Sequence, residues 1–421
     1  MSWAETRLKH LCTDSGQYGL NVPADQYRSS GTRLIRTSDI AVNGELKSAR
    51  EGVFVDAVLE PRHQLRQGDI LLSRSGTLGR SLLVPAGADG HSFAGFLIRF
   101  RPNSDAEPRF LKYATQSAPF QGVVHSEAVS STIQNFNADR YANIPLRAPD
   151  VDEQRRIADF LDVEIARVDA LITARNSQVR GLEQLWEARL ASRVDGLIAT
   201  YGLVALRRLV TSVEQGWSPQ CEDSEAAPQE WAILKTSAVS SGRFKPLEHK
   251  RLPNSLEPDL RHEITDGDIL MTRGSGSPAH VGVAAVARTE GRRLLLSDLL
   301  YRVRLASGWS PEFVALLLGS RPVRGRMALL FRGQSGQTIK LRAEDIKAIE
   351  IPAVPSDVQD EISDALTRVR RDIISAQQAI HQSSSLLAER RQALITAAVT
   401  GQFDVSTAGG RNVTDGVTAS P

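Results

Sequence analysis

The sequence has few of the features that define several common protein classes. Only two of its 421 residues are cysteines, Cys12 and Cys221, which is too few for a disulfide framework. It has no run of about 18 apolar residues, which excludes a membrane-spanning helix, and its first residues lack the apolar stretch of an export signal. We therefore expect a reduced, cytoplasmic protein. The formal net charge is only +2, so bulk charge does not indicate a nucleic-acid partner.

The sequence also lacks the usual enzyme and metal-site motifs. There is no glycine-rich loop ending in Gly-Lys-Ser/Thr, no His-Glu-x-x-His and no Gly-x-Ser-x-Gly. Gly274–Ala279 fits a dinucleotide fingerprint, but a strand is predicted after it where the fingerprint needs a helix. Glu45 and Lys47 fit the Glu-x-Lys pattern of some nucleases, but a turn between strands explains this segment equally well. We expect no catalytic residue, no metal and no cofactor.

The chain repeats itself at a domain-sized interval. LIRTSDI at 34–40 recurs as ILKTSAV at 233–239, and GDILLSR at 68–74 recurs as GDILMTR at 267–273; the offset is 233 − 34 = 267 − 68 = 199 residues. Further matches follow at slightly larger offsets, as loop insertions would produce. The sequence therefore consists of two copies of one unit, and the period is too long for a solenoid.

Each copy begins with a mixed part and ends with a helical part. Strands are predicted at 81–84 and 281–287, and short helices at Pro108–Gln116 and Pro311–Leu318, where proline occupies a tolerated first-turn position.

The helical parts carry apolar residues at alternating spacings of four and three. This pattern runs from Leu161 to Trp186 in the first copy and from Ile362 to Leu394 in the second. The flanking helix breakers are Pro149, Pro355, Gly196 and Gly401.

A long amphipathic helix cannot bury its apolar stripe alone, so the two helices are expected to pair within the chain. Antiparallel pairing gives a compact molecule with pseudo-twofold symmetry; the alternative is a coiled coil between chains. The predicted fold class is α+β, with two mixed domains joined by two long helices in an antiparallel coiled coil. The expected segments are domain 1–148, helix 149–200, domain 201–354, helix 355–402 and a disordered tail at 403–421.

These motifs resemble the specificity (S) subunit of type I restriction-modification systems over residues 1–405. The resemblance rests on RTSDI, GDILLSRSGTLGR and IPLRAPDVDEQRRIADFLDVEIARVDALI in the first copy, and on GDILMTRGSGS, IPAVPSDVQDEISDAL and ERRQALITAAVTGQFDV in the second. It implies two target recognition domains that each read half of a split sequence in double-stranded DNA. It also implies long helices that bind two methyltransferase (modification) subunits, and restriction subunits that join this core, while the S subunit does no chemistry.

The second copy departs from the motif pattern in two places. Asp357–Ile362 stands where the first copy has the Asp-Glu-Gln-Arg-Arg-Ile of residues 152–157. Lys340 and Leu341 stand where the first copy keeps Asn135.

Three groups of residues are candidates for DNA contact, each with an ordinary structural explanation. Arginine-containing glycine turns can approach bases or phosphates, although the glycines also serve the turns themselves. Polar runs before the long helices offer Gln and Asn for adenine, although solvated loops look the same. A basic residue before a hydroxyl suits phosphate, although shared packing also explains its repetition. The candidates are Arg74, Ser75, Gly76, Thr77, Arg80, Arg273, Gly274, Ser275 and Gly276; Ser131, Thr132, Gln134, Asn135, Gln334, Ser335, Gln337 and Lys340; and Arg36 and Lys235.

Residues on the helices are less suited to DNA contact. Arg155, Arg156, Arg390 and Arg391 are expected on solvated faces or in protein contacts, and Trp186 is expected in the core because of its heptad position. Arginine outnumbers lysine 43 to 8, but a GC-rich genome explains that bias as well as DNA binding does.

Two other function classes remain open from the residues alone. The chain could be a non-catalytic coiled-coil adaptor that joins two proteins without reading DNA sequence. It could also be a fused nuclease or methyltransferase, against which the missing motifs argue.

Overall fold

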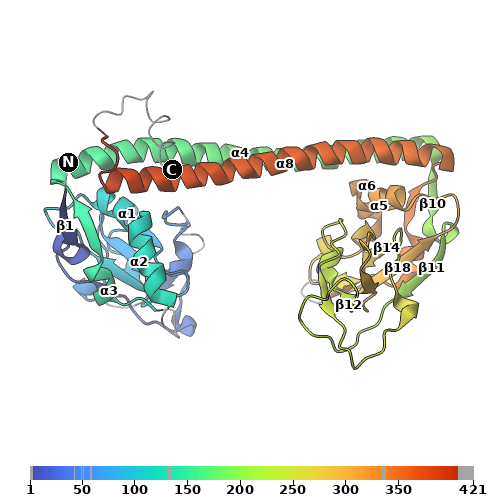
Figure 1. The fold of residues 1–421 in the computed structure, drawn as a ribbon, viewed down its shortest axis with the longest axis horizontal. Coiled ribbons are helices and arrows are strands. Elements are labelled where there is room, and N and C mark those ends of the chain that lie inside the picture. The colour runs from blue at the N-terminus through green and yellow to red at the C-terminus, as the bar shows by residue number, and fades with distance from the viewer. Residues whose placement is uncertain are drawn as a thin grey trace. The chain divides into compact units, whose positions relative to one another are not determined.

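The computed structural model describes residues 3–41, 43–48, 50, 52–56, 59–129, 135–333 and 338–405. They form two compact units, one built from Met1–Asn176 with His381–Pro421 and the other from Ser177–Ile380. Two long helices, α4 (Val151–Tyr201) and α8 (Ser356–Val399), contribute to both units (Figure 1). Because the unit boundary cuts both helices, the five-segment division expected from the sequence remains a prediction.

The first unit contains three sheets, with the strand orders β2-β8-β5-β6, β4-β3-β7 and β1-β9. Neighbouring strands are antiparallel except β3 and β7, which are parallel. Helices α1 (Pro108–Gln116), α2 (Ala118–Val129) and α3 (Ala138–Asn143) accompany the sheets. The strands are β1 (Ala4–Arg7), β2 (Gln17–Tyr18), β3 (Thr32–Ile35), β4 (Val53–Val55), β5 (Ile70–Ser73), β6 (Ser81–Leu83), β7 (Ser92–Phe93), β8 (Leu97–Phe100) and β9 (Pro145–Ala148).

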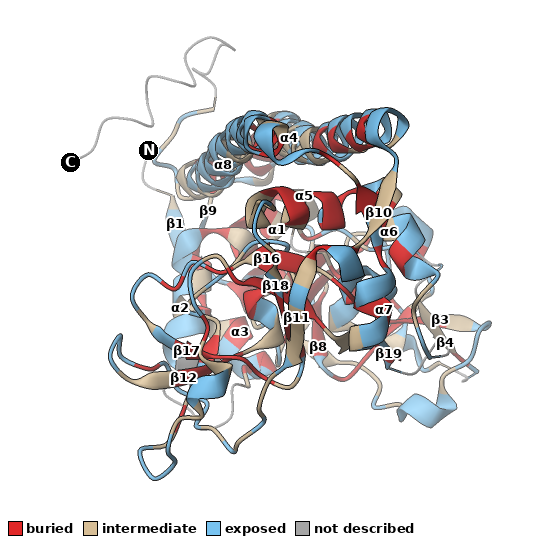
Figure 2. Cartoon of the chain, turned by 90° about the vertical axis from the view of Figure 1, so that its right-hand side faces the viewer, coloured by how far each residue is buried: buried red, intermediate tan, exposed pale blue. Residues whose placement is uncertain are grey.

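The second unit repeats this topology in the orders β11-β18-β14-β16, β13-β12-β17 and β10-β20, again with one parallel pair, β12 and β17. It adds a two-stranded ladder between β15 and β19. Figure 2 shows buried stretches in β16, β18 and α5. The elements are β10 (Leu203–Ala205), β11 (Val210–Gln215), β12 (Trp231–Leu234), β13 (His249–Arg251), β14 (Ile269–Thr272), β15 (Gly274–Ser275), β16 (Ala284–Val286), β17 (Arg293–Leu295), β18 (Leu300–Leu305), α5 (Pro311–Gly319), α6 (Arg321–Ala328), β19 (Ile339–Lys340), α7 (Ala343–Ala348) and β20 (Glu350–Pro352).

The matching strand orders confirm the predicted internal repeat and the α+β class. Two local expectations differ. The strand predicted over 281–287 is shorter because Gly282 has φ +68° and makes a turn before it. Helix α4 continues through Gly196 and ends before Gly202, because buried Val194 and Leu197 hold that turn in the core despite glycine's low helix propensity.

The long helices pair antiparallel within each unit. In the first unit Arg391 of α8 donates to Asp169 of α4, Nε to Oδ1, over 3.0 Å. In the second unit Arg370 donates to Glu183 over 2.9 Å, and its guanidinium lies 5.2 Å from the centre of the Trp186 ring. Residues later in α4 thus contact residues earlier in α8, as antiparallel helices do. Trp186 is buried, as its heptad position predicted.

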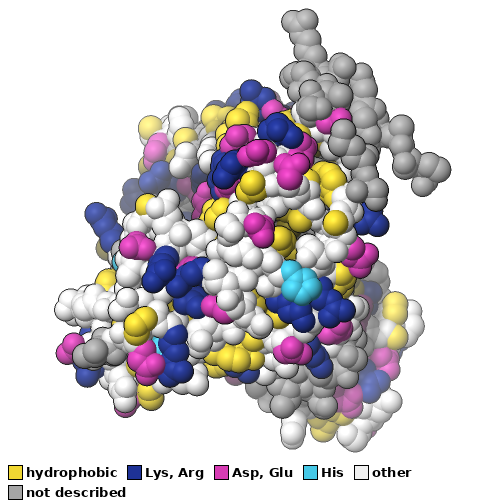
Figure 3. All heavy atoms as spheres, turned by 90° about the vertical axis from the view of Figure 1, so that its left-hand side faces the viewer, with side chains coloured by type: hydrophobic (Ala, Val, Ile, Leu, Met, Phe, Trp, Pro, Cys, Tyr) yellow, Lys and Arg dark blue, Asp and Glu magenta, His cyan; other side chains and the backbone are white. Residues whose placement is uncertain are grey.

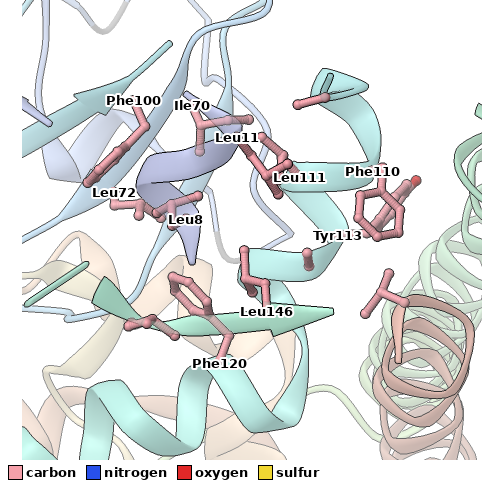
Figure 4. Close-up of a cluster of buried hydrophobic side chains, with 14 of the residues drawn as sticks. Leu8, Leu11, Ile70, Leu72, Phe100, Phe110, Leu111, Tyr113, Phe120 and Leu146 are labelled. Atoms are coloured by element: carbon pink, nitrogen blue, oxygen red, sulfur yellow. The ribbon is translucent and has the colours of Figure 1, made fainter. Parts of the chain in front are cut away.

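Each unit completes its core with residues from both long helices. In the first unit Ile157, Leu161 and Ile165 of α4 share a cluster with Leu394 and Ile395 of α8. Figure 4 shows part of this cluster, where Leu72 and Phe100 lie near Leu8, and Ile70 lies near Leu11 and Leu111. The end of α8 is therefore part of the first unit's core. Burying one such apolar side chain contributes about 1.5–3 kcal/mol to stability.

One buried glutamine fixes the start of each long helix. Gln154 accepts from the Glu107 amide over 2.9 Å and donates to the carbonyls of Asp105 and Pro149 over 3.0 and 2.9 Å. Gln359 accepts from the Ser310 amide over 3.0 Å and donates to the Val354 carbonyl over 2.9 Å. The motif difference between the copies therefore leaves this contact intact.

The aspartate of each GDIL motif is structural. Asp69 accepts from the Arg66 amide over 2.8 Å and forms an ion pair with Arg101 at 2.7 Å. The hydrogen bond to Asp69 is the main cause that raises the pKa of Arg101. Asp268 likewise caps the Thr265 amide over 3.0 Å and pairs with Arg304 at 3.3 Å. These bonds fix the turns that lead into β5 and β14, the strands that Arg74 and Arg273 follow.

The end of the chain is described as far as Val405. Phe403 packs against Phe160, with ring centroids 5.6 Å apart, and Val405 packs on the first unit's core. The rest of the predicted tail, 406–421, lies outside the described residues.

Candidate nucleic-acid interface

In the first unit, the loop after β5 places Arg74 against two residues from distant parts of the chain. The Arg74 guanidinium lies 4.8 Å from the centre of the Tyr18 ring, and its Nε donates to Asn135 Oδ1 over 3.2 Å. Ser75 pairs with Asn135 in an antiparallel bridge. The structure therefore brings together two candidate regions 61 residues apart. Arg74 is half-buried, so its orientation is held by these contacts.

The rest of this loop divides into exposed and inward-facing residues. Gly76 has φ +73° with open space where a Cβ would stand, and Thr77 is exposed. Arg80 turns inward, donating from Nη1 to the Ile40 carbonyl over 2.8 Å. Its amide donates to Ser73 Oγ over 2.9 Å, which closes the loop. Arg80 thus holds the loop's base, while Ser75, Gly76 and Thr77 form its tip.

The second unit forms the same loop after β14. Gly274 and Ser275 of β15 pair with Lys340 and Ile339 of β19, the position that Ser75 and Asn135 occupy in the first unit. A Cβ on Gly274 would stand 3.0 Å from the Ile339 carbonyl oxygen, so this ladder favours glycine. Arg273 donates from Nη1 to the Asp298 carbonyl over 3.4 Å.

Exposed groups lie next to this second ladder. Lys340 is exposed, and Gly276 has open space beside it. The second loop therefore presents a lysine where the first presents an asparagine.

The basic residues of the third candidate group already have acidic partners. Arg36 pairs with Asp39 at 3.2 Å, and its guanidinium lies 5.8 Å from the Tyr27 ring centre. Lys235 pairs with Asp223 at 3.2 Å, and the hydrogen bond from Lys235 lowers the pKa of the Asp223 carboxyl. These pairs partly neutralise the charges, so both residues contribute more to turn structure than to an electropositive surface.

Several candidates cannot be placed. Ser131, Thr132 and Gln134 in the first copy, and Gln334, Ser335 and Gln337 in the second, lie outside the described residues.

Sequence reasoning did not find Tyr18, which positions Arg74. The signal available was the repeat itself, because Tyr18-Gly19 aligns with Gln215-Gly216. Both glycines approach a backbone closely: a Cβ on Gly19 would lie 2.3 Å from the Phe93 carbonyl oxygen, and one on Gly216 would lie 2.1 Å from that of Leu296. A glycine required twice at one site marks a close approach of two chain segments.

The arginines on the long helices make protein contacts, as the sequence suggested for them. Arg155 and Arg156 pair with Asp152 and Glu153 one turn earlier, and Arg391 pairs with Asp169. Arg390 is exposed.

Two other kinds of site are missing from the described residues. No group of three or more His, Cys, Asp or Glu side chains among them could hold a metal ion. In that same part of the chain no helix is long and apolar enough to cross a membrane. The face of the first unit in Figure 3 carries Lys and Arg in small groups interspersed with Asp and Glu.

Comparisons with known proteins agree with this architecture. Residues 42–180 match the family model described as type I restriction modification DNA specificity domain. The specificity subunit of the type I restriction enzyme EcoKI from Escherichia coli K12 is 26% identical over 400 residues, covering 86% of this chain and 84% of that protein. The EcoEI specificity subunit of Escherichia coli is 31% identical over 154 residues, covering 36% of this chain and 26% of that protein.

A solved structure has the same fold. It comes from work on complex assembly and conformational transition of the type I R-M system, and it superposes with a TM-score of 0.70 at 17% identity, covering 96% of this chain and 98% of the other. The fold is thus one in which a mixed domain is duplicated and two long helices pair. Over most of its length the chain is similar to specificity subunits of type I restriction enzymes, and residues 42–180 match their DNA specificity domain.

Proposed function

We propose that the chain is the DNA sequence-recognition subunit of a type I restriction-modification complex and binds a bipartite, asymmetric DNA target. The observation that carries this is the pair of equivalent arginine loops on one repeated framework. The loop at Arg74 is completed by Asn135, and the loop at Arg273 is completed by Lys340. Equivalent backbones with different polar groups suit two half-sites of different sequence.

The proposed DNA contacts follow from this geometry. Arg74 and Arg273 offer guanidinium groups that suit guanine edges or phosphates. Gly76 and Gly276 leave open space through which backbone amides can approach a phosphate. Asn135 can pair with adenine, whereas exposed Lys340 suits phosphate or guanine. The proposal gives a supporting role in the loop structure to Arg36, Lys235 and Arg80. Their side chains already bond within the protein.

The partners belong to the same proposal. The chain would position two methyltransferase subunits, which methylate adenine, and restriction subunits, which cleave DNA, and would itself be non-catalytic and need no cofactor. Relatives named as subunits of type I restriction enzymes support this assignment. The proposed DNA target places the complex in the cytoplasm. Partner subunits that share phosphate contacts would be consistent with the small net charge of +2.

The decisive experiment is single-molecule methylation sequencing of host DNA with and without this chain. We expect a split, asymmetric methyladenine motif that disappears on deletion. Unchanged methylation, with a methyltransferase still bound to the chain in a pull-down, would contradict the proposal and support the adaptor function.

Point variants locate the reading residues. R74A is expected to relax base preference in one half of the motif and R273A in the other, each by about 1–3 kcal/mol per lost base contact. R147A, at an exposed position of β9 outside the two arginine loops, is the matched control and should leave the motif unchanged. Motifs unaffected by either loop variant would remove Arg74 and Arg273 from the proposal.

A further inference from the structure

A large apolar side chain is exposed at the same place in both domains. Phe96 lies in the turn between β7 and β8 and is 65% exposed; Leu299 lies in the turn between β17 and β18 and is 50% exposed. Both turns are closed by the same backbone bond, from Leu97 N to the Ala94 carbonyl over 2.9 Å and from Leu300 N to the Ser297 carbonyl over 3.0 Å. Single exposed apolar residues are common, so the informative observation is that this one recurs.

These turns are joined directly to the arginine loops. The Arg74 amide donates to the Phe96 carbonyl over 2.9 Å, and the Arg273 amide donates to the Leu299 carbonyl over 3.0 Å. In each domain the arginine and the apolar residue are therefore hydrogen-bonded neighbours on adjacent segments.

The backbone below both side chains is tightly fixed. Leu20 forms a parallel bridge with Ala94, and Trp217 forms one with Ser297. The close glycines Gly19 and Gly216 bring those segments together. The exposed side chains thus stand on constrained turns and not on loose loops. Leaving one of them in water forgoes the stabilisation that its burial would give, and a partner that covers it recovers that stabilisation.

The surface around Phe96 extends the apolar area in the first domain. A shallow cavity of about 200 Å³ beside it is lined by Leu20, Val22, Tyr27 and Ala94, among others. Phenylalanine also offers a flat ring, whereas Leu299 offers a smaller, branched group. The two domains therefore present different apolar tips on the same backbone.

We propose that Phe96 and Leu299 are specificity-determining residues that pack against the apolar surface of a base in the half-site read by their own domain. This inference rests on the proposed function, because it takes the arginine loops as the DNA-facing surface. The arginine supplies polar or phosphate contact, and the neighbouring tip supplies the apolar contact that favours one base over others. The larger ring and the cavity beside it predict the stronger effect in the first domain.

The test compares F96A and L299A in the complete complex with its methyltransferase subunits. The readout is selection from a DNA library randomised in both halves of the motif. F96A is expected to reduce base discrimination about 5- to 100-fold at one or two positions of one half only, the range of a single base mismatch. L299A should have a smaller effect confined to the other half, so each variant's unaffected half is an internal control.

Two further variants complete the design. F96L keeps an apolar tip and should reduce base discrimination only partly. If F96A folds poorly, the result for F96L tests the proposal in its place. L260A removes an exposed leucine on a different loop, the 3-10 helix Leu260–His262, and should leave both halves unchanged.

The outcomes separate the two proposals. A wild-type complex that selects no bipartite motif overturns the proposed function and this inference with it. A wild-type motif that F96A, F96L and L299A all leave intact overturns only the role of the two tips. Equal weakening of both halves by one variant also overturns it, because a base contact acts on its own half-site.

Discussion

The two units share a topology but attach their domains to the helices by different chemistry. In the first unit Arg109 of α1 bonds Asp159 and Asp162 of α4 over 2.7 and 2.8 Å, and the Tyr113 hydroxyl donates to Asp162 over 2.7 Å. In the second unit the matching helix α5 presents Leu316 instead, beside a cavity of about 550 Å³ that Thr367 and Arg370 of α8 also line.

This difference shows which contacts the repeat requires. The glutamine at the start of each long helix makes the same kinds of bonds in both units, because its buried side-chain amide needs hydrogen-bond partners there. The fold does not require the partly exposed ion pairs of Arg109 in the same way, since surface ion pairs add little stability. The repeat thus keeps its buried polar contacts and has diverged at its exposed ones.

The largest expected difference between the units is the loss of stability when a buried arginine is replaced by methionine. Arg302 is only 2% exposed and bonds Glu214 and the carbonyls of Glu263 and Arg261. R302M should destabilise the second unit by about 3–5 kcal/mol, because it removes a buried charge that bonds one carboxylate and two backbone carbonyls. Arg99, its counterpart, bonds Asp14 and one backbone carbonyl, that of Arg62, so R99M removes fewer contacts and should cost about 1.5–3 kcal/mol.

Hydrogen exchange read by mass spectrometry gives the free energy of opening for each unit separately. Equal losses in the two variants would contradict the link between the number of lost hydrogen bonds and the loss of stability.

The glutamine contacts should give equal effects in the two units. Q154A and Q359A each remove a buried side-chain amide and leave one backbone amide and at least one carbonyl without that partner, which costs about 1–3 kcal/mol for the unit concerned. Q184A, on an exposed face of α4, should change stability by less than about 0.5 kcal/mol. Denaturant unfolding of the three variants measures this. A loss of stability in only one of the two units would show that the same hydrogen-bond geometry does not contribute the same free energy in both.

The smallest effect concerns acid sensitivity. The hydrogen bond from Arg370 lowers the pKa of Glu183 in the second unit, so this contact stabilises the folded state above the unfolded pKa and is lost as pH falls through the folded one. E183Q should therefore cost below about 1 kcal/mol at neutral pH, and the difference from wild type should shrink as pH falls. D169N, the equivalent change in the first unit, is the comparison. An E183Q deficit that grows toward acid pH would reverse the sign and contradict the assignment.

Much of this fold could be predicted from the sequence because its signals are local or repeated. The heptad spacing predicted both long helices, and the two GDIL motifs revealed the duplication. Helix Pro108–Gln116 has the predicted bounds. Strand pairing was out of reach, since the parallel contact of β3 with β7 joins segments whose sequences carry no mark of each other.

The candidate interface was predictable only in part. Arg74 and Asn135 were each singled out by residue type, but their direct hydrogen bond needs the tertiary fold. The pairing of Arg36 with Asp39 was hidden because a basic residue before a hydroxyl looks the same with or without an acidic partner. Phe96 was missed because the sequence alone does not distinguish an exposed apolar residue from the buried strand residues next to it.

The contribution of α8 to the first unit's core has a consequence for synthesis on the ribosome. The second unit is contiguous, whereas the first cannot bury Ile157, Leu161 and Ile165 fully until Leu394 and Ile395 have been made. Translation of the intervening stretch takes roughly 10–45 seconds at about 5–20 residues per second. The part of the protein that is made first is therefore finished last, and its open apolar strip is where a chaperone would bind the nascent chain.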